Sequence, residues 1–237
     1  MWAKFPSLIQ NNGSKRVRHD TKHVIELSKD ARPVKCRPRR LLGPKLEAAK
    51  RAFAKLEKAG FIRRSKSRFA SPLHLVPKGQ DYRTCGDYVA INAMTEPDNY
   101  PLPHIQDFVA DLEGKTIFSK IDMVKAYHQI PMAEDSIPFT AVMTPFGLWE
   151  WLVMPFGLCN AAQTFQRFID EVTQGLPNKF VYLDDILVAS STKEEHEKDL
   201  RLLFKRLQDY GLTVNPAKCE LGESELMYCI YMYCNVL

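Results

Sequence analysis

Two adjacent carboxylates, Asp184 and Asp185, interrupt an apolar, β-prone run at residues 180–188. The apolar residues on both sides predict two short strands joined by a tight turn, with the two carboxylates at its tip. Burying carboxylates without a partner is costly, so proteins usually pair such groups with a cation. Mg²⁺, with a substrate phosphate completing its shell, suits these oxygen ligands. A solvated Asp-Asp turn is the alternative interpretation, because Asp is itself common in turns.

A third carboxylate, Asp122, lies near the end of another β-type run at residues 117–123. A strand that ends in Asp, beside a hairpin that carries Asp-Asp, can gather three carboxylates around two metal ions. Two ions about 3.5–4 Å apart clamp the attacking and leaving oxygens of a phosphoryl transfer. The alternative is that Asp122 caps the amino terminus of a helix that begins at Met123.

The composition is that of an ordinary globular protein, with 45% hydrophobic and 26% charged residues in a chain of 237. This length suffices for one large domain or two small ones. No apolar run approaches the roughly 20 residues of a membrane span, and no secretory signal opens the chain, so a membrane is not an expected partner. The six cysteines form no C-x-x-C pair. We interpret them as free thiols of an intracellular compartment, cytoplasmic or nuclear.

The net charge of +5 is unevenly distributed along the chain. Residues 1–66 hold 19 Lys and Arg against 5 Asp and Glu, whereas the rest of the chain is acidic. Such asymmetry favours contact between the amino-terminal part and a polyanion such as nucleic acid. Arg63, Arg64 and Lys66 belong to one of the densest clusters and are suited to neutralising phosphates without reading a base sequence. A solvated basic face is the alternative.

Periodicity and turn residues predict helices alternating with hairpins, without a regular βαβ rhythm. Helices are expected at residues 43–60, 104–112, 161–174 and 194–210. Strands are expected at 69–77, paired with 82–92, in a hairpin formed by 139–144 and 148–154, and starting at 212–214. This order predicts an α+β fold with an antiparallel sheet.

The motifs follow one another in a recognisable order. They are RPRRL at residues 37–41, ASPL at 70–73, VPK at 76–78, YRTCGDY at 82–88, YPLP at 100–103, FSKID at 118–122, AYHQI at 126–130, MPFGLCNA at 154–161, TFQ at 164–166 and YLDD at 182–185. In this combination the chain resembles the reverse transcriptase domain of gypsy-type LTR retrotransposons. The resemblance runs from about residue 5 to residue 221.

The resemblance implies a right-hand polymerase fold, in which an antiparallel palm sheet carries the catalytic carboxylates. Residues 1–40 are then a basic arm, and residues 41–221 form the reverse transcriptase domain. The fingers are expected at about 41–103 and 133–157, and the palm at about 104–132 and 158–221. Residues 222–237 form a divergent tail where the family has its primer grip and thumb.

The resemblance also implies a reaction, the attack of a primer 3′-hydroxyl on the α-phosphate of a dNTP. Asp122, Asp184 and Asp185 match the catalytic carboxylates, which hold two Mg²⁺ ions, or Mn²⁺ in their place. The main-chain carbonyl of Met123 is expected to add an oxygen ligand.

Five further positions match the substrate site of the family. Arg83 and Lys78 are expected to contact the triphosphate, for which a forked guanidinium is well suited. Tyr127 matches the aromatic residue under the sugar, and Phe156 and Gly157 line the nucleotide pocket. Taken singly, Arg83 is equally a surface strand residue, and Tyr127 and Phe156 are equally packing aromatics.

The expected partners are an RNA or DNA template with its primer, and a dNTP. In the family this domain is part of a longer Pol polyprotein with RNase H and integrase regions, which are not recognisable in these 237 residues. The alternative function is that of an inactive, truncated remnant of a retroelement that only binds nucleic acid.

Overall fold

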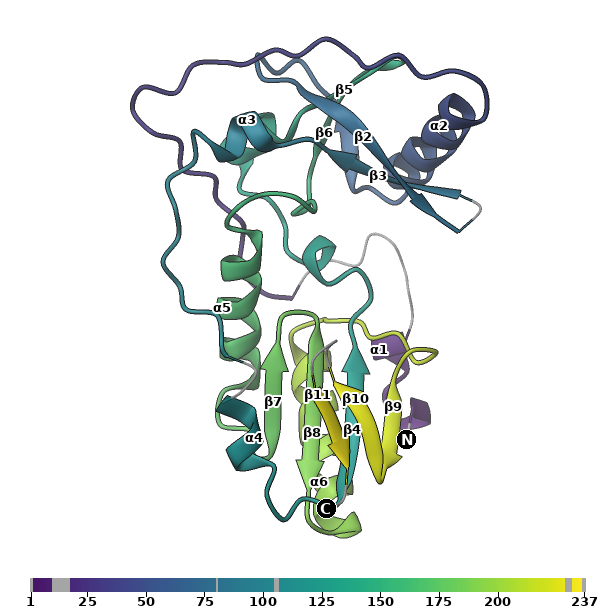
Figure 1. Cartoon of the computed structure of the whole chain (residues 1–237), viewed down its shortest axis with the longest axis vertical. Helices are drawn as coiled ribbons and strands as arrows, with labels where there is room; N and C mark the ends of the chain where they lie inside the picture. The colour runs from purple at the N-terminus through teal and green to yellow at the C-terminus, as the bar shows by residue number, and fades with distance from the viewer. Residues whose placement is uncertain (1, 10–17, 80, 105–106, 229–231, 236–237) are drawn as a thin grey trace. The chain divides into compact units, whose positions relative to one another are not determined.

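The structure is a computed structural model that describes residues 2–9, 18–79, 81–104, 107–228 and 232–235. The chain divides into two compact units, whose elements are labelled in Figure 1. Unit 1 comprises Met1–Asp20, Tyr100–Ala126 and Ala162–Leu237, and unit 2 comprises Thr21–Asn99 and Tyr127–Ala161. Each unit is built around its own sheet, so the two are described separately.

The main sheet of unit 1 is antiparallel throughout, with the strand order β7-β8-β4-β9 (Figure 1). Its strands are β4 (Ile117–Asp122), β7 (Lys179–Tyr182), β8 (Asp185–Ser190) and β9 (Glu220–Glu223). Apolar residues such as Ile121, Ile186 and Val188 bury the two central strands. The prediction of an α+β fold with an antiparallel sheet is confirmed.

One face of this sheet is covered by α6 (Lys193–Asp209), which packs on β8 and β4. Leu200, Leu203 and Leu207 recur at helical spacing on its buried side. The side chain of Thr192 accepts a hydrogen bond from the main-chain N–H of Glu195 at 3.3 Å, which caps the start of the helix. This helix and α5 (Ala161–Thr173) confirm the helices predicted at 194–210 and 161–174.

A buried polar network joins α6 to the two central strands. The Nε2 atom of His196 lies 2.7 Å from Oγ of Ser119 in β4, and its Nδ1 atom lies 3.0 Å from Oγ of Ser190 in β8. Ser190 also donates to the carboxylate of Asp199 at 3.0 Å. Burial lowers the pKa of His196. Since every member is hydrogen-bonded, the network fixes the relative positions of β4 and β8.

The opposite face of the same sheet carries a separate apolar cluster. Phe118, Phe180, Leu187 and Ala189 pack there with Leu226 of β10. The cluster is flanked by a short hairpin and a short helix, namely β10 (Glu225–Tyr228), β11 (Met232–Asn235) and α4 (Asp107–Asp111). The helix predicted at 104–112 is thus confirmed over its described part, although it is shorter than expected.

The first residues of the chain dock on α6. They form η1 (Trp2–Lys4) and α1 (Pro6–Ile9), and Leu8 is completely buried. The ring of Trp2 stacks on Phe204 with a centroid distance of 4.9 Å. Residues 18–40, by contrast, contain only isolated bridges and turns.

Unit 2 contains a five-stranded sheet in the order β1-β6-β5-β2-β3. Its strands are β1 (Ile62–Arg64), β2 (Ser71–Lys78), β3 (Asp81–Gly86), β5 (Val142–Thr144) and β6 (Gly147–Trp151). Only the pairing of β2 with β5 is parallel. The predicted hairpin of 139–144 with 148–154 is confirmed in shorter form, because η3 (Glu134–Thr140) occupies its first residues.

The helix predicted at 43–60 is confirmed as α2 (Gly43–Lys58). The predicted strand 82–92 is wrong beyond Gly86, because the chain turns inward there and forms α3 (Val89–Asn92). Tyr88 is buried, and its hydroxyl donates to the carbonyl of Thr140 at 3.0 Å. A Cβ atom on Gly86 would overlap the Tyr88 ring, so this turn requires glycine.

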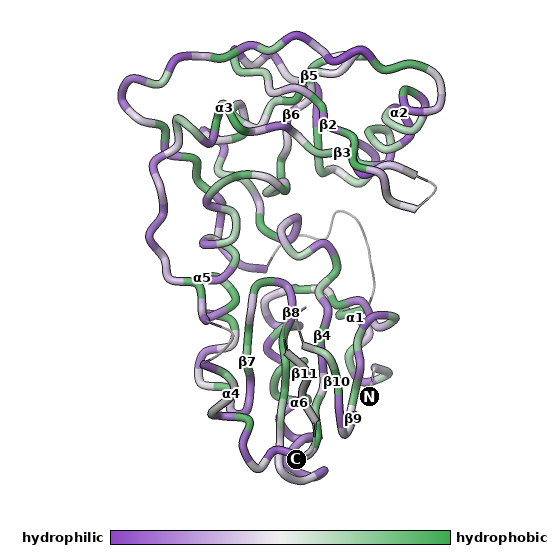
Figure 2. The backbone as a smooth tube through the Cα atoms, viewed as in Figure 1, coloured by the Kyte–Doolittle hydropathy of each residue, from purple (hydrophilic) through white to green (hydrophobic). Residues whose placement is uncertain are grey.

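The strand predicted at 212–214 is also wrong, since Val214 makes only an isolated bridge with Met123. The remaining short helix is η2 (Ala126–Gln129). The helices carry hydrophilic as well as hydrophobic residues (Figure 2). Within the described part of the chain, none has the length and apolar character that crossing a bilayer requires.

Candidate active site

The three carboxylates predicted as catalytic all lie in unit 1, at one end of the sheet. Asp122 is the last residue of β4 and is the cross-strand partner of Asp185, the first residue of β8. Residues directly opposite in an antiparallel pair project to the same face, with Cβ atoms about 4.5–5.5 Å apart. Asp184 immediately precedes Asp185 in the sequence and lies in the turn between β7 and β8. The structure therefore brings the three positions together, as the sequence predicted.

The turn that carries Asp184 has an unusual backbone. Leu183 adopts a φ of 53°, in the left-handed region that side chains with a Cβ rarely occupy. Its N–H donates at 2.9 Å to the side-chain oxygen of Gln166, a completely buried residue of α5. The amide nitrogen of Gln166 in turn donates to Asp170 and to the carbonyl of Val181. Gln166 thus fixes the turn, a role that the sequence motif did not reveal.

The end of β4 is held by main-chain contacts on both sides. The N–H of Met123 donates to the carbonyl of Asp184 at 3.4 Å. The carbonyl of Asp122 accepts a hydrogen bond from the N–H of Asn215 at 2.8 Å. These contacts fix the backbone of Asp122 and use only its main-chain atoms, so its side chain projects from a rigid position, which is the arrangement that ligand positioning requires.

Two lysines neutralise the carboxylate pair. Nζ of Lys120 lies 3.4 Å from an oxygen of Asp185, and Nζ of Lys218 lies 3.3 Å from an oxygen of Asp122. The carboxylate side chains of Asp185 and Asp122 are 23% and 19% exposed, but Lys218 is itself 66% exposed, so water screens its ion pair more than that of Lys120. Neither lysine was singled out from the sequence, because a lysine within a strand or a turn carries no signal of its own.

The electrostatics of the site reflect the crowding of negative charge. Burial raises the pKa of Asp185, and the neighbouring Asp184 and Asp122 raise it further, while Lys120 acts in the opposite direction. Burial also raises the pKa of the Cys219 thiol, to about 11, next to the Asp122 carbonyl. The thiol is therefore neutral at physiological pH and adds no negative charge at this end of the sheet.

These donors fit a hard divalent cation by their chemistry. Carboxylate oxygens are the ligands that Mg²⁺ prefers, and a cation would relieve the repulsion that raises the pKa of Asp185. Within the described residues, however, no three acidic, His or Cys side chains stand close enough together to hold an ion as they are placed. To bind an ion, Asp122 and Asp185 must therefore release Lys218 and Lys120 and contact the ion in their place.

The predicted nucleotide-pocket residues lie in unit 2. The rings of Tyr127 and Phe156 are 5.1 Å apart, so the structure brings these two together. Gly157 has a φ of 97°, which favours glycine, and its carbonyl accepts a hydrogen bond from the side chain of Asn92 at 2.8 Å. The same side chain accepts from the N–H of Cys159 at 3.0 Å. Asn92 therefore shapes this loop, a second role that the sequence did not reveal.

The two predicted phosphate-binding cations lie on the hairpin of β2 and β3. Arg83 is exposed and pairs across the hairpin with Val76. Lys78 pairs with Asp81 next to the hairpin turn, and its side chain lies outside the described part of the structure. The structure thus places both residues on one hairpin.

Two of the three predicted nucleic-acid-binding cations already have partners within unit 2. Nε of Arg63 donates at 2.7 Å to Glu150, a residue only 6% exposed. The guanidinium of Arg64 lies 3.8 Å above the ring of Trp149 and donates to the carbonyl of Phe146. Lys66 is exposed. Arg63 and Arg64 therefore stabilise the sheet as well as presenting charge.

The antiparallel sheet carries paired carboxylates at one end, and the solved structures that resemble this chain share its fold. Together these observations define the class as a right-hand polymerase. A foamy viral protease-reverse transcriptase, solved in complex with an RNA/DNA hybrid, superposes with a TM-score of 0.86 over 96% of this chain and 31% of that chain, at 24% identity. The native prototype foamy virus enzyme gives a TM-score of 0.81 at 22% identity. At such identities the likeness establishes the fold.

The sequence comparisons establish the family. The family described as reverse transcriptase (RNA-dependent DNA polymerase) matches residues 76–232. The Pol polyprotein of transposon 297 from Drosophila melanogaster is 41% identical over 174 residues, which cover 70% of this chain and 16% of that polyprotein. The transposon Tf2-3 polyprotein of Schizosaccharomyces pombe is 37% identical over 177 residues, covering 73% and 13%.

The chain therefore belongs to the reverse transcriptase family, and the predicted resemblance to retrotransposon Pol proteins is confirmed. It spans less than a fifth of the length of these two polyproteins.

Proposed function

We propose that this chain is an RNA-directed DNA polymerase domain that extends a primer on an RNA or DNA template. In this reaction the primer 3′-hydroxyl attacks the α-phosphate of a dNTP and pyrophosphate leaves. The observation that carries the proposal is the pairing of Asp122 with Asp185 across β4 and β8, with Asp184 in the turn that Gln166 holds. Membership of the reverse transcriptase family supports it.

The carboxylates have distinct roles in this proposal. Asp122 and Asp184 hold both metal ions, Asp185 is a nearby and weaker ligand, and the carbonyl of Met123 adds an oxygen. When bound by these oxygens, two Mg²⁺ ions, or Mn²⁺ in their place, would supply Lewis-acid chemistry for a phosphoryl transfer.

The substrate side of the proposal rests on unit 2. Arg83 grips the triphosphate with its forked guanidinium, and Lys78 on the same hairpin assists it. The contact between Tyr127 and Phe156 supports a common aromatic surface, with Tyr127 under the sugar, where it excludes a 2′-hydroxyl. Gly157 allows the backbone to approach the nucleotide closely. Lys66, with the exposed parts of Arg63 and Arg64, contacts template phosphates.

The division of the chain into two units supports the assignment of fingers and palm. We assign the palm to about residues 104–132 and 158–221 and the fingers to about 41–103 and 133–157. All three proposed catalytic carboxylates then belong to the palm, and Arg83 and Lys78 belong to the fingers.

Primer extension tests the proposal directly. The full 237-residue chain is incubated with an RNA template, an annealed DNA primer, dNTPs and Mg²⁺. Asp184→Asn keeps the shape of the side chain but removes its charge, and we expect extension to fall by at least about 10²–10³-fold. Asp209→Asn makes the same change at an exposed position at the end of α6 and serves as the control. Extension by Asp184→Asn at the control's rate would contradict the assignment.

A second function, nucleic-acid binding without catalysis, is favoured by one observation. The lysine ammonium groups occupy Asp122 and Asp185, and the described side chains form no ready set of three metal ligands. If the chain binds a primer–template in a salt-dependent manner but extends it with neither Mg²⁺ nor Mn²⁺, this second function replaces the first.

A further inference from the structure

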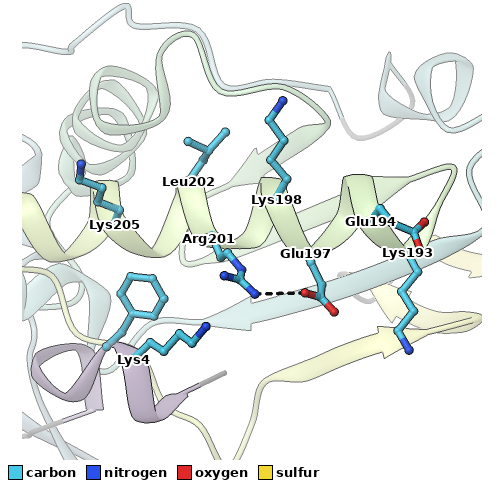
Figure 3. A pocket seen from close by; sticks show the side chains of 9 residues that line it. Lys4, Lys193, Glu194, Glu197, Lys198, Arg201, Leu202 and Lys205 are labelled. Carbon is cyan, nitrogen blue, oxygen red and sulfur yellow. Dashed lines mark hydrogen bonds and ion pairs between the residues drawn. The ribbon is translucent and has the colours of Figure 1, made fainter.

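A basic groove runs along the exposed face of α6 in unit 1, beside the amino-terminal residues of the chain. We call it the α6 groove; its volume is about 680 Å³. Five cations line it, Lys4, Lys193, Lys198, Arg201 and Lys205. Figure 3 shows Lys4 and Arg201 extending into the space between η1 and α6.

The groove is a built feature, because the amino-terminal residues are anchored on α6. The stacking of Trp2 on Phe204 and the edge-on packing of Phe5 against the same ring, at 5.6 Å, fix one wall. The side chain of Gln208 donates to Ser7, and the N–H of Val214 donates to the carbonyl of Leu8 at 2.9 Å. Lys4 is therefore held next to the cations of the helix.

The charges of the groove are unbalanced. Glu194 and Glu197 are its only acidic lining residues among those described, and Glu197 is bonded to Arg201 at 3.2 Å (Figure 3). Lys4, Lys193, Lys198 and Lys205 are exposed and have no ion-pair partner among the described residues. Gathering like charges is unfavourable in the absence of a ligand, so the arrangement suits a polyanion.

The cations of α6 form one continuous row. Lys198, Arg201 and Lys205 are separated by three and four residues, so they lie on the same helix face. At 1.5 Å per residue they span about 10 Å along the axis. Regularly spaced cations on a rigid helix match the repeating charges of a phosphate backbone better than a single small anion.

The α6 groove is separate from the proposed catalytic carboxylates. Successive side chains of a strand alternate between the faces of its sheet. Ser119 contacts His196 of α6, so Lys120 and Asp122, one and three residues further along β4, both project from the face opposite to α6. A strand held in the groove thus lies behind the sheet from the catalytic centre.

We propose that the α6 groove binds the phosphate backbone of a single-stranded stretch of nucleic acid, as a site additional to the proposed catalytic carboxylates and nucleotide-binding residues. An acidic protein segment is the competing partner. A docked amphipathic peptide needs several apolar anchors, whereas the described lining of the groove offers two apolar side chains, Leu202 and Phe5. One partly exposed aromatic ring, that of Phe5, lies among the cations and suits contact with an unpaired base next to its phosphates. The proposal does not depend on the catalytic assignment.

Oligonucleotide binding tests the proposal. A fluorescent single-stranded DNA of mixed sequence is titrated with the full chain, and anisotropy is measured over a series of salt concentrations. A triple variant removes three of the cations at once, and we expect it to bind more weakly. It combines Lys198→Gln, Arg201→Gln and Lys205→Gln. It is also expected to flatten the slope of log K against log[salt] by about 2, since each phosphate contact on a single strand contributes about 0.7.

The matched control changes the same helix in the opposite sense. Glu194→Gln with Glu197→Gln removes two negative charges from the groove and is expected to tighten binding. Thermal melts of each variant confirm folding, and Lys205→Gln alone, with an expected slope change of about 0.7, replaces the triple variant if the triple fails to fold.

Two results would overturn the proposal. One is an unchanged salt slope in a folded triple variant, because the groove then makes no phosphate contact. The other comes from competition. If poly-glutamate displaces the oligonucleotide from wild type at a lower concentration than unlabelled DNA does, and does not do so from the triple variant, the surface belongs to an acidic protein. Since the readout is binding, a chain that never extends a primer still tests the α6 groove, and loss of the groove leaves the catalytic proposal standing.

Discussion

The ammonium group of Lys120 lies 3.4 Å from a carboxylate oxygen of Asp185 on the adjacent strand. Both side chains are about one fifth exposed, so the pair is partly shielded from water. Lys120 therefore balances one of the three carboxylates that the proposed function assigns to metal binding. A divalent ion that takes Asp185 as a ligand must compete with this lysine.

Replacing the lysine tests that competition. Lys120→Met removes the charge but keeps a similar length, and we expect the affinity of the chain for Mn²⁺ at pH 8 to rise about 1.4- to fivefold. This corresponds to the 0.2–1 kcal/mol typical of a partly exposed ion pair. Isothermal titration calorimetry without nucleotide measures it. Lys120→Arg keeps the charge and should bind as wild type does; weaker binding by Lys120→Met would show that the lysine does not compete.

The turn before Asp185 gives a second prediction. Gln166→Leu removes the acceptor for the N–H of Leu183, whose backbone is already strained at a φ of 53°. A buried donor without a partner costs about 1–3 kcal/mol, so we expect that loss in the free energy of unfolding and a matching fall in primer extension. Urea denaturation and single-nucleotide incorporation measure the two effects.

The same helix supplies the control for that variant. Gln163 also lies in α5, and its Oε1 atom is buried without a hydrogen-bond partner among the described residues. Gln163→Leu makes an identical chemical change but removes an unsatisfied group, so stability should stay equal or rise. Equal destabilisation by both variants would indicate that the volume of leucine, rather than the Leu183 contact, causes the effect.

The sequence was sufficient to predict the strands and turn that carry Asp122, Asp184 and Asp185, because each lies at an abrupt change from apolar to acidic residues. Long amphipathic helices such as α2 and α6 were equally visible. Their hydrophobic periodicity is local, and local patterns are what a sequence displays directly.

The structural features that the sequence did not reveal depend on contacts between residues that are far apart in the chain. Gln166 is 17 residues from Leu183, and Asn92 is 65 residues from Gly157, so neither partner is evident before the chain folds. The strand predicted beyond Gly86 failed because burial of Tyr88 outweighs the β propensity of its neighbours. Lysines such as Lys120 and Lys218 become informative only once a carboxylate stands opposite them.

Substitutions of Arg63 and Lys66 should differ in their effect on stability, because only Arg63 has an ion-pair partner among the described residues. Glu150 is only 6% exposed, and its carboxylate accepts hydrogen bonds from Arg63 and from the hydroxyl of Ser65. Arg63→Ala therefore leaves Ser65 as the one side-chain donor to Glu150 among the described residues. We expect this change to cost about 1–3 kcal/mol of stability, and Lys66→Ala to cost less than about 0.5 kcal/mol. Denaturant titration measures both. Equal stability of the two variants would show that the ion pair with Glu150 contributes nothing to folding.

His23 makes the stability of unit 2 depend on pH. It is 1% exposed, and burial lowers its pKa from 6.5 to about 4, although Asp98 acts in the opposite direction. The unfolded chain therefore binds the proton more readily, so stability is full above pH 6.5 and falls as the pH drops from 6.5 towards 4. At pH 5 the loss from this residue is about 2 kcal/mol. Denaturation at pH 7.5 and pH 5 should show that loss in wild type and a smaller one in His23→Gln, since glutamine does not titrate; equal losses in both would assign the acid sensitivity to other groups.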